Sequence, residues 1–263
     1  MYFVQSLHIY PVKSARGLEV KSSGLDRFGL EGDRRWMLTD SEGRFVTQRE
    51  LPELTELQVD VSPAGLVLKR GNADIAVPIP ETSARVPVTV WEDTVSAADA
   101  GDAAAGWLAT VFQRPLRLVY MPDDSRRAVD PDYAKDGETV SFADGFPLLL
   151  VSAASAVYLN QRLAQPVGLD RFRPNIVVAG CPAHAEDQWQ RLRIGEMVFT
   201  VAKSCSRCVV PSLDQNTGAR HPELLRVLAD YRRGPGRKVY FGQNLVYQGS
   251  GHLRVGDAVE VLG

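Results

Sequence analysis

The chain is dominated by short strand-like segments that glycine, proline, asparagine and aspartate separate. In the first hundred residues these segments lie at 3–12, 34–40, 43–49, 54–62, 65–70, 73–80 and 84–100. Further along they lie at 174–180, 191–205, 239–248 and 252–263. Many short strands at close spacing are typical of a barrel or a sandwich, whereas a parallel α/β sheet alternates strands with helices. We therefore expect a mainly β fold with a few helices, in the α+β class.

Turn residues indicate how some of these strands connect. Ser41, Glu42 and Gly43 separate 34–40 from 43–49 and predict a hairpin. The stretches LRIGEMVFTV and LRVGDAVEVL, within 191–205 and 252–263, share a strand, a glycine–acid turn and a second strand. We interpret them as two hairpins of one barrel, although an internal repeat would give the same rhythm.

Three segments have helical spacing and recognisable ends. Residues 101–113 offer Asp102 as a cap, and residues 152–163 offer Ser152 or Ser155. The segment 221–233 has a proline near its first turn and arginines before a glycine at its end, which is the expected asymmetry. We expect one helix in each of the three segments.

The segment 121–145 is polar and rich in turn residues, and it predicts a long surface loop or lid. It lies between the two strand-rich halves. We therefore divide the chain into a domain at 1–120 and a second domain at 121–263.

Charge and cysteine content exclude several classes of protein. With 30 basic and 32 acidic residues the formal charge is −2, which argues against a general nucleic-acid binder. No stretch approaches 18 consecutive apolar residues, so no membrane span is expected, and the start lacks the features of a secretory signal. Three cysteines do not make a disulfide framework, and a reducing cytoplasm is the expected compartment.

Cys205 and Cys208 form a C-x-x-C pair with several possible meanings. A structural zinc site needs a second half-site, but the remaining cysteine and the histidines are scattered singly. A thioredoxin-like disulfide needs a helix after the first cysteine, whereas Pro211 follows here. The other readings are a single reactive thiolate, favoured by the basic neighbours, and two inert buried thiols.

Basic side chains in apolar or strand-like surroundings bear on this choice. Lys13 and Ser14 follow the first strand, Arg34 and Arg35 open the second, and Arg173 precedes Pro174 and Asn175. The arginine fork binds two oxygen atoms at once, and it is the usual choice for partly buried phosphate recognition. Together with the thiol these residues predict a local site for an anion and a metal.

Several motifs in order make the chain recognisable. They are YPVKS (10–14), GDRRWMLTD (32–40), FPLLLVSAASAVYLN (146–160), FRPNIVVAG (172–180), CSRCVVPSLDQNTG (205–218), FGQNLV (241–246) and VGDAVEVLG (255–263). The chain resembles the MOSC family, within it the branch of the mitochondrial amidoxime-reducing component and bacterial reductases of N-hydroxylated compounds. The resemblance implies a MOSC β-barrel body with an N-terminal MOSC β-rich subdomain.

The resemblance also implies a molybdenum cofactor, a pterin that binds the metal through a dithiolene and carries a terminal phosphate. Cys208 would be the protein ligand to molybdenum and the catalytic residue, with Cys205 a neighbour. The residues expected to hold the pterin and its phosphate are Lys13, Ser14, Arg34, Arg173, Asn175, Ser206 and Arg207, with Ser152 and Ser155 as weaker candidates.

The implied activity is the two-electron reduction of N-hydroxylated or N-oxide small molecules. The sequence contains no C-x4-C-x2-C pattern and no GxGxxG fingerprint, so a separate flavin or iron–sulfur protein is expected to supply the electrons. No general acid is apparent, since Asp214 lies in a turn-forming stretch. The alternatives are a non-catalytic carrier or sulfur-transfer module for the cofactor, and a thiol protein that uses both cysteines.

Overall fold

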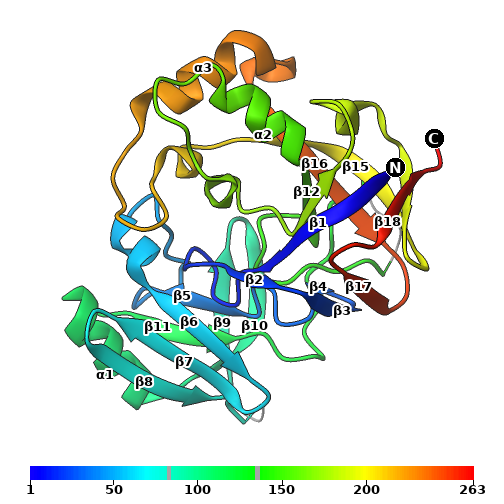
Figure 1. Cartoon of the computed structure of the whole chain (residues 1–263). Helices are drawn as coiled ribbons and strands as arrows, with labels where there is room; N and C mark the ends of the chain where they lie inside the picture. Colours follow the sequence, from blue (N-terminus) through cyan, green and yellow to red (C-terminus); the bar gives the residue numbers. More distant parts are fainter. Residues whose placement is uncertain (82–83, 134–136) are drawn as a thin grey trace.

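The computed structural model describes residues 1–81, 84–133 and 137–263. Figure 1 shows two β-rich parts, a barrel that carries both chain termini and a lower part built from the first half of the chain. Helices α2 (Ala153–Asn160) and α3 (Pro222–Arg232) lie against the barrel, and α1 (Asp102–Phe112) lies against the lower part. The expected mainly β fold is therefore confirmed.

Seven strands close the barrel. Going round it, they are β13 (Ile176–Ala179), β12 (Leu148–Ser152), β16 (Tyr240–Tyr247), β15 (Met197–Ser206), β14 (Arg191–Ile194), β18 (Ala258–Val261) and β1 (Tyr2–Ile9). The first and last of these pair with each other, with Leu7 opposite Ile176, and β2 (Leu18–Val20) extends the far end of β1. Only β12 and β13 pair in parallel among these strands. Closure satisfies the strand edges that an open sheet would leave unpaired.

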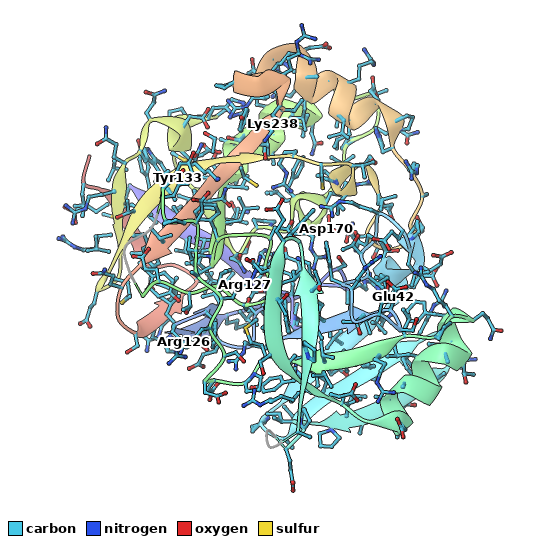
Figure 2. All side chains as sticks on the ribbon, turned by 180° about the vertical axis from the view of Figure 1, so that it is seen from behind. Glu42, Arg126, Arg127, Tyr133, Asp170 and Lys238 are labelled. Carbon is cyan, nitrogen blue, oxygen red and sulfur yellow. The ribbon has the colours of Figure 1, made fainter. Side chains whose placement is uncertain are left out.

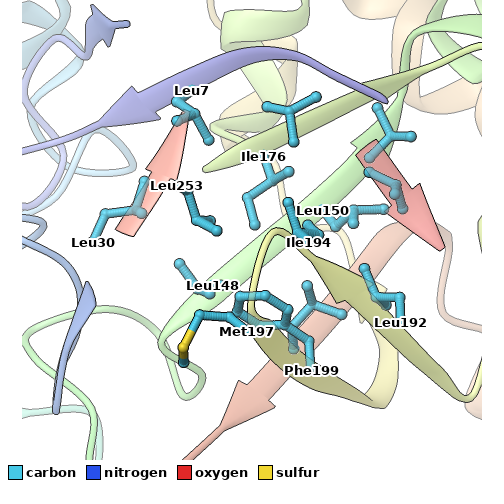
Figure 3. Packing of buried hydrophobic residues seen from close by; sticks show 14 of the residues in the cluster. Leu7, Leu30, Leu148, Leu150, Ile176, Leu192, Ile194, Met197, Phe199 and Leu253 are labelled. Carbon is cyan, nitrogen blue, oxygen red and sulfur yellow. The ribbon is translucent and has the colours of Figure 1, made fainter. Parts of the chain in front are cut away.

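Apolar side chains fill the barrel, as Figure 3 shows. Leu7, Leu150, Ile176 and Phe199 are fully buried there and come from different strands. Because side chains alternate between the two faces of a strand, each strand contributes its inward residues to this core. The barrel interior is thus a packed core, and any ligand site must lie at its rim.

The lower part contains two further sheets and a helix. One sheet has the order β5 (Trp36–Thr39), β11 (Arg117–Tyr120), β10 (Asp93–Asp99) and β9 (Arg85–Val90). The other has β6 (Gln58–Ser62), β7 (Gly65–Arg70) and β8 (Ala73–Pro78). Leu38, Leu68 and Leu108, from the two sheets and α1, meet in one buried cluster.

Strands from the beginning of the chain pair with strands from its end. A small sheet joins β3 (Ser22–Asp26) and β4 (Gly29–Leu30) to β17 (Gly251–Arg254), and β1 belongs to the barrel. Short 3-10 helices lie at Pro52–Glu56, Leu169–Phe172, Ala185–Gln188, Val210–Ser212 and Pro235–Arg237. The division of the chain at residue 120 stays a prediction, because the earliest strands pair with the latest ones.

One predicted hairpin is shorter than expected and another is absent. The segment 43–49 turns back on 34–40 through the antiparallel bridge between Thr39 and Phe45, and the Val46 N–H donates to the Leu38 carbonyl at 2.8 Å. Phe45 then donates its backbone N–H to the Thr89 carbonyl, so 43–49 does not continue as a strand. The segment 252–263 contains two strands, but β17 pairs with β3 while β18 pairs with β1 and β14. By contrast, β14 and β15 do form the predicted hairpin.

All three predicted helices are present, and Ser152 caps α2 by accepting a hydrogen bond from the Ser155 N–H. The prediction that Asp102 caps α1 was wrong. Gly101 occupies the cap position with a φ of 89°, and Asp102 is the first helical residue, paired with Arg117 at 3.1 Å. No described helix has the length and apolar character needed to span a membrane.

The segment 121–145 is irregular, as predicted, but it is not confined to the surface. Arg127 and Phe142 are buried, and Arg127 donates hydrogen bonds to the carbonyls of Ser141 and Ala143 and to the Asp93 carboxylate. Residues 134–136 lie outside the described part of this segment. The end of the segment therefore packs between the two β-rich parts and leads into the pocket described next.

Candidate functional site

A pocket with about 820 Å³ of empty space, including its open mouth, lies where the two β-rich parts meet. Figure 2 shows the β9–β10 hairpin reaching the centre of the molecule, near the labelled Arg127. Most of the predicted site residues line this pocket: Lys13, Ser14, Arg34, Arg173, Asn175, Ser206, Arg207 and Cys208. Residues far apart in the sequence thus meet around one cavity.

Two arginines are arranged around one tyrosine. The guanidinium carbons of Arg34 and Arg173 each lie 4.2 Å from the centroid of the Tyr10 ring. Both arginines have positive φ values, 48° and 56°, in the left-handed region that few side chains adopt. Burial raises the pKa of Tyr10, so the ring stays neutral between two cations. Stacking on this ring fixes the position of both positive charges.

Arg34 is further held by its neighbours. Its Nη1 donates to the Asp33 carboxylate at 2.5 Å and to Oδ1 of Asn175 at 3.0 Å. That Oδ1 also accepts from the Leu149 N–H at 3.1 Å, and the Asn175 Nδ2 donates to the His8 carbonyl. Asn175 is therefore a positioning residue whose hydrogen bonds lie within the protein.

Two buried nitrogen atoms at the pocket have no hydrogen-bond partner among the described residues: Nη2 of Arg173 and Nε of Arg207. Each side chain is held elsewhere, since Arg173 Nη1 donates to the Ala15 carbonyl at 2.7 Å and Arg207 Nη2 to the Phe172 carbonyl at 2.8 Å. Burial, followed by repulsion from Arg34, lowers the pKa of Arg173 to about 10, so it remains a cation near neutral pH. A buried unpaired donor is costly, and an anion in the pocket would satisfy both.

Lys13 adds a fourth cation to the pocket. Its ammonium is buried and donates to the Phe142 carbonyl at 2.7 Å and to the Asp144 carboxylate at 2.6 Å. Burial lowers the pKa of Lys13 to about 8, although Asp144 opposes that shift. Lys13 is therefore protonated at neutral pH but loses its charge in mildly alkaline solution.

The two cysteines of the C-x-x-C pair differ in their surroundings. Cys208 is exposed at the pocket, and Arg49 Nη2 donates to its Sγ at 3.5 Å. Cys205 is half-buried at the end of β15, and its Sγ accepts from Arg207 Nη1 at 3.0 Å. Both are free thiols that line the pocket, and Cys208 is the more exposed of the two.

The described residues contain no group of three or more His, Cys, Asp or Glu side chains that could hold a metal ion. A metal at Cys208 would therefore take most of its ligands from an organic cofactor. The segment after Cys208 is a 3-10 helix of three residues, so the helix that a thioredoxin-like pair requires does not follow. Asp214 accepts from two backbone N–H groups and from Arg171, which is the geometry of a turn-forming residue.

The sequence is similar to those of known protein families and proteins. Residues 1–115 match the MOSC N-terminal beta barrel domain, and residues 137–260 match the MOSC domain. Mitochondrial amidoxime-reducing component 1 of Homo sapiens is 34% identical over 99% of this chain and 83% of its own length. The chain belongs to the MOSC family. The molybdenum cofactor sulfurase of Bos taurus is 30% identical over 94% of this MOSC chain, which matches 30% of that longer protein.

The structure places Ser152 and Ser155 away from the pocket of this MOSC protein. Both are fully buried, their hydroxyls lie 2.7 Å apart, and the Ser155 hydroxyl donates to Oε1 of Glu186 at 2.7 Å. Ser155 also accepts from the His184 N–H. These hydrogen bonds cap α2 and stabilise a buried carboxylate, so neither hydroxyl is free to bind a phosphate in the pocket.

Sequence reasoning missed several pocket residues, among them Thr47, Arg49, Asp144 and Phe146. Arg49 lies in a segment interpreted as an ordinary strand, and Asp144 at the end of a segment interpreted as a surface loop. The one available signal was the FADG sequence directly before the conspicuous FPLLLVS strand. The missed residues line the pocket only because the lower part packs against the barrel of the MOSC fold.

Proposed function

We propose that this MOSC protein is a molybdenum-cofactor-dependent reductase of small N-hydroxylated or N-oxide compounds. The observation that carries the proposal is the pair of unsatisfied buried donors, Arg173 Nη2 and Arg207 Nε, in the same pocket as the exposed Cys208 thiol. An anionic cofactor with a metal that accepts a soft thiolate ligand fits both features. The relatives named amidoxime-reducing component support the class of reaction.

In this proposal Cys208 is the protein's ligand to molybdenum. Lys13, Arg34, Arg173 and Arg207 would hold the phosphate and the polar edge of the pterin, because they supply cationic donors around the cavity. Ser14 and Ser206 line the same pocket. When bound, the cofactor supplies the two-electron chemistry by which an N-hydroxyl compound, two electrons and two protons give the reduced nitrogen compound and water.

The chain itself orients these groups and keeps water from part of the pocket. Phe146, Leu148 and Phe172 form its apolar wall, and Asp33 and Asn175 fix Arg34. Charged groups that are held in place and partly desolvated interact more strongly with a bound anion than mobile surface residues do. The expected contribution of the protein is therefore a preorganised cation cluster beside one accessible thiol.

The electrons would come from a separate flavin or iron–sulfur protein. The sequence given contains no motif for either group, and the MOSC relatives cover nearly the whole chain. We propose the cytoplasm as the compartment, because three cysteines in a chain of this length do not form a disulfide framework.

The test compares Cys208→Ala with Cys205→Ala, a matched thiol three residues away. Protein made in a host that synthesises the cofactor should contain about one molybdenum per chain in the wild type and in Cys205→Ala, and almost none in Cys208→Ala. Reduction of an amidoxime by an artificial electron donor should follow metal content. Full metal retention in Cys208→Ala would refute the ligand assignment.

A second candidate function is a carrier that binds the cofactor without turnover. The match to molybdenum cofactor sulfurase over 94% of the chain favours it. Metal-loaded protein that reduces no amidoxime, hydroxylamine or N-oxide from a broad panel would support the carrier and refute the reductase.

A further inference from the structure

Trp91 occupies an unusual position at the tip of the β9–β10 hairpin. It follows Val90 directly, and Val90 pairs with Asp93 across the turn. Its φ is 57°, a conformation that glycine adopts freely and bulky residues rarely do, and its surface is 42% exposed. Strained backbone conformations cluster at functional sites, so the Trp91 ring is a candidate for a functional role.

The contacts of Trp91 lead to the pocket. The Arg49 guanidinium carbon lies 4.6 Å from the Trp91 ring centroid, and the indole Nε1 donates to Oδ1 of Asp144 at 3.3 Å. The Phe45 ring supports Trp91 from another side, at 5.0 Å between centroids. Arg49 and Asp144 both line the pocket, so Trp91 fixes two charged residues at its mouth.

Arg49 is the residue that this arrangement presents to a ligand. None of the ion pairs found among the described residues includes Arg49, although its charge acts on the Asp144 carboxylate, and its Nη2 lies 3.5 Å from Sγ of Cys208. A guanidinium that rests on an aromatic ring is held flat, and flat conjugated groups stack on its open face. Its charge repels cationic groups.

We propose that Trp91 and Arg49 form a substrate-selecting wall that favours neutral, planar, conjugated N-hydroxylated compounds over saturated ones of the same size. For turnover the inference rests on the proposed reductase function, whereas for binding it stands alone.

The experiment uses a matched pair of ligands, benzamidoxime and cyclohexanecarboxamidoxime, which differ in the planarity of the ring. Calorimetry on metal-loaded protein without a reductant measures binding alone. The wild type should bind benzamidoxime about fivefold more tightly. Trp91→Gly should bind the two compounds equally, while Glu92→Ala, in the same turn but without a contact to the pocket, should keep the preference.

Two further variants separate the role of the wall from a general loss of structure. Trp91→Phe keeps an aromatic ring and should retain most of the preference for benzamidoxime. Arg49→Lys keeps the charge but has no flat surface, so this preference should be lost. Glycine relieves the strained turn but removes the contacts of the ring with Arg49, Asp144 and Phe45, so the melting temperature of Trp91→Gly should stay within about 4 °C of the wild type. A preference that is unchanged in Trp91→Gly, or absent in the wild type, overturns the proposal.

Turnover distinguishes the two proposals. Selective binding by a metal-loaded protein that reduces neither these two compounds nor any other of the broad panel supports the wall and refutes the reductase. Reduction of both compounds at equal kcat/KM, with equal affinities, refutes the wall and leaves the reductase supported.

Discussion

Arg49 Nη2 lies 3.5 Å from Sγ of Cys208, although 159 positions separate the two residues in the chain. Arg49 belongs to the lower β-rich part, and Cys208 follows the longest strand of the barrel. The site is thus completed by packing one part against the other, and a ligand on Cys208 would contact both.

Replacement of Arg49 by alanine should reduce activity without removing the cofactor. A hydrogen bond to a charged group contributes about 1.5–3 kcal/mol, so kcat/KM for an amidoxime should fall about tenfold or more. Molybdenum content should stay at the wild-type level, because Cys208 and the other cations are intact. Arg44→Ala is the control, since Arg44 is exposed, pairs with Glu42 at 3.1 Å and is not among the residues that line the pocket; equal activity in both variants would contradict the prediction.

Arg173→Met should separate binding from stability. The variant removes a buried cation with an unsatisfied Nη2, and replacing a buried charge by an apolar side chain of similar size is often neutral or stabilising. We expect the free energy of unfolding of the cofactor-free protein to stay within about 1 kcal/mol of the wild type. Molybdenum content measured by mass spectrometry should fall steeply. A strongly destabilised variant would show that Arg173 is structural.

Anion binding should weaken above about pH 8 because of Lys13. Its pKa is lowered to about 8 in the folded protein, so between pH 7 and pH 9 the ammonium loses its proton. Calorimetric titration with sulfate, whose charge is constant in this range, should show falling affinity, and Lys13→Met should make the response flat.

The lowered pKa of Lys13 affects folding in the opposite direction, because it makes the protein more stable as the pH rises. The unfolded chain keeps the Lys13 proton up to its ordinary pKa of 10.5, so it binds more protons than the folded chain between about pH 8 and 10.5. The contribution of Lys13 to stability therefore rises with pH in this window. In Lys13→Met that rise in the free energy of unfolding should be absent; its persistence would assign it to another group.

Ser155→Ala should destabilise the protein and leave cofactor content unchanged. The variant removes the hydroxyl that donates to the buried Glu186 carboxylate at 2.7 Å, which should cost about 1–3 kcal/mol in denaturant unfolding. Ser206→Ala, at the exposed wall of the pocket, should have little effect on stability. Loss of molybdenum in Ser155→Ala at full stability would restore the serine to the phosphate site.

The pocket cations could be predicted because they are basic residues in apolar or strand-like stretches, where the strand or turn itself does not require a charge. Lys13, Arg34 and Arg173 each border a strand, and the structure brings them together with Arg207. The serines at the start of α2 show the limit of such reasoning. A helix cap and a phosphate site use the same residues, and Glu186, 31 positions beyond Ser155, decides between them.

Other features were outside the reach of local patterns. The spacing of residues in 252–263 predicts a strand, a turn and a second strand, as found. The partners of these strands depend on the whole topology, and β17 and β18 join different sheets. Trp91 and Arg49 likewise become neighbours only when the hairpin tip meets the segment after Phe45. Periodicity gives the kind of element, whereas the identity of its neighbours is set by tertiary packing.

The position of β1 in the barrel has a consequence for the order of folding. Its barrel partners β13 and β18 lie far along the chain from it, so the barrel closes only through pairing over long sequence separations. Such pairing is slow, and until it occurs Lys13 and Ser14, shortly after β1, have no fixed place relative to Arg173 and Cys208. The cation cluster of the pocket is therefore assembled late in folding, together with closure of the barrel.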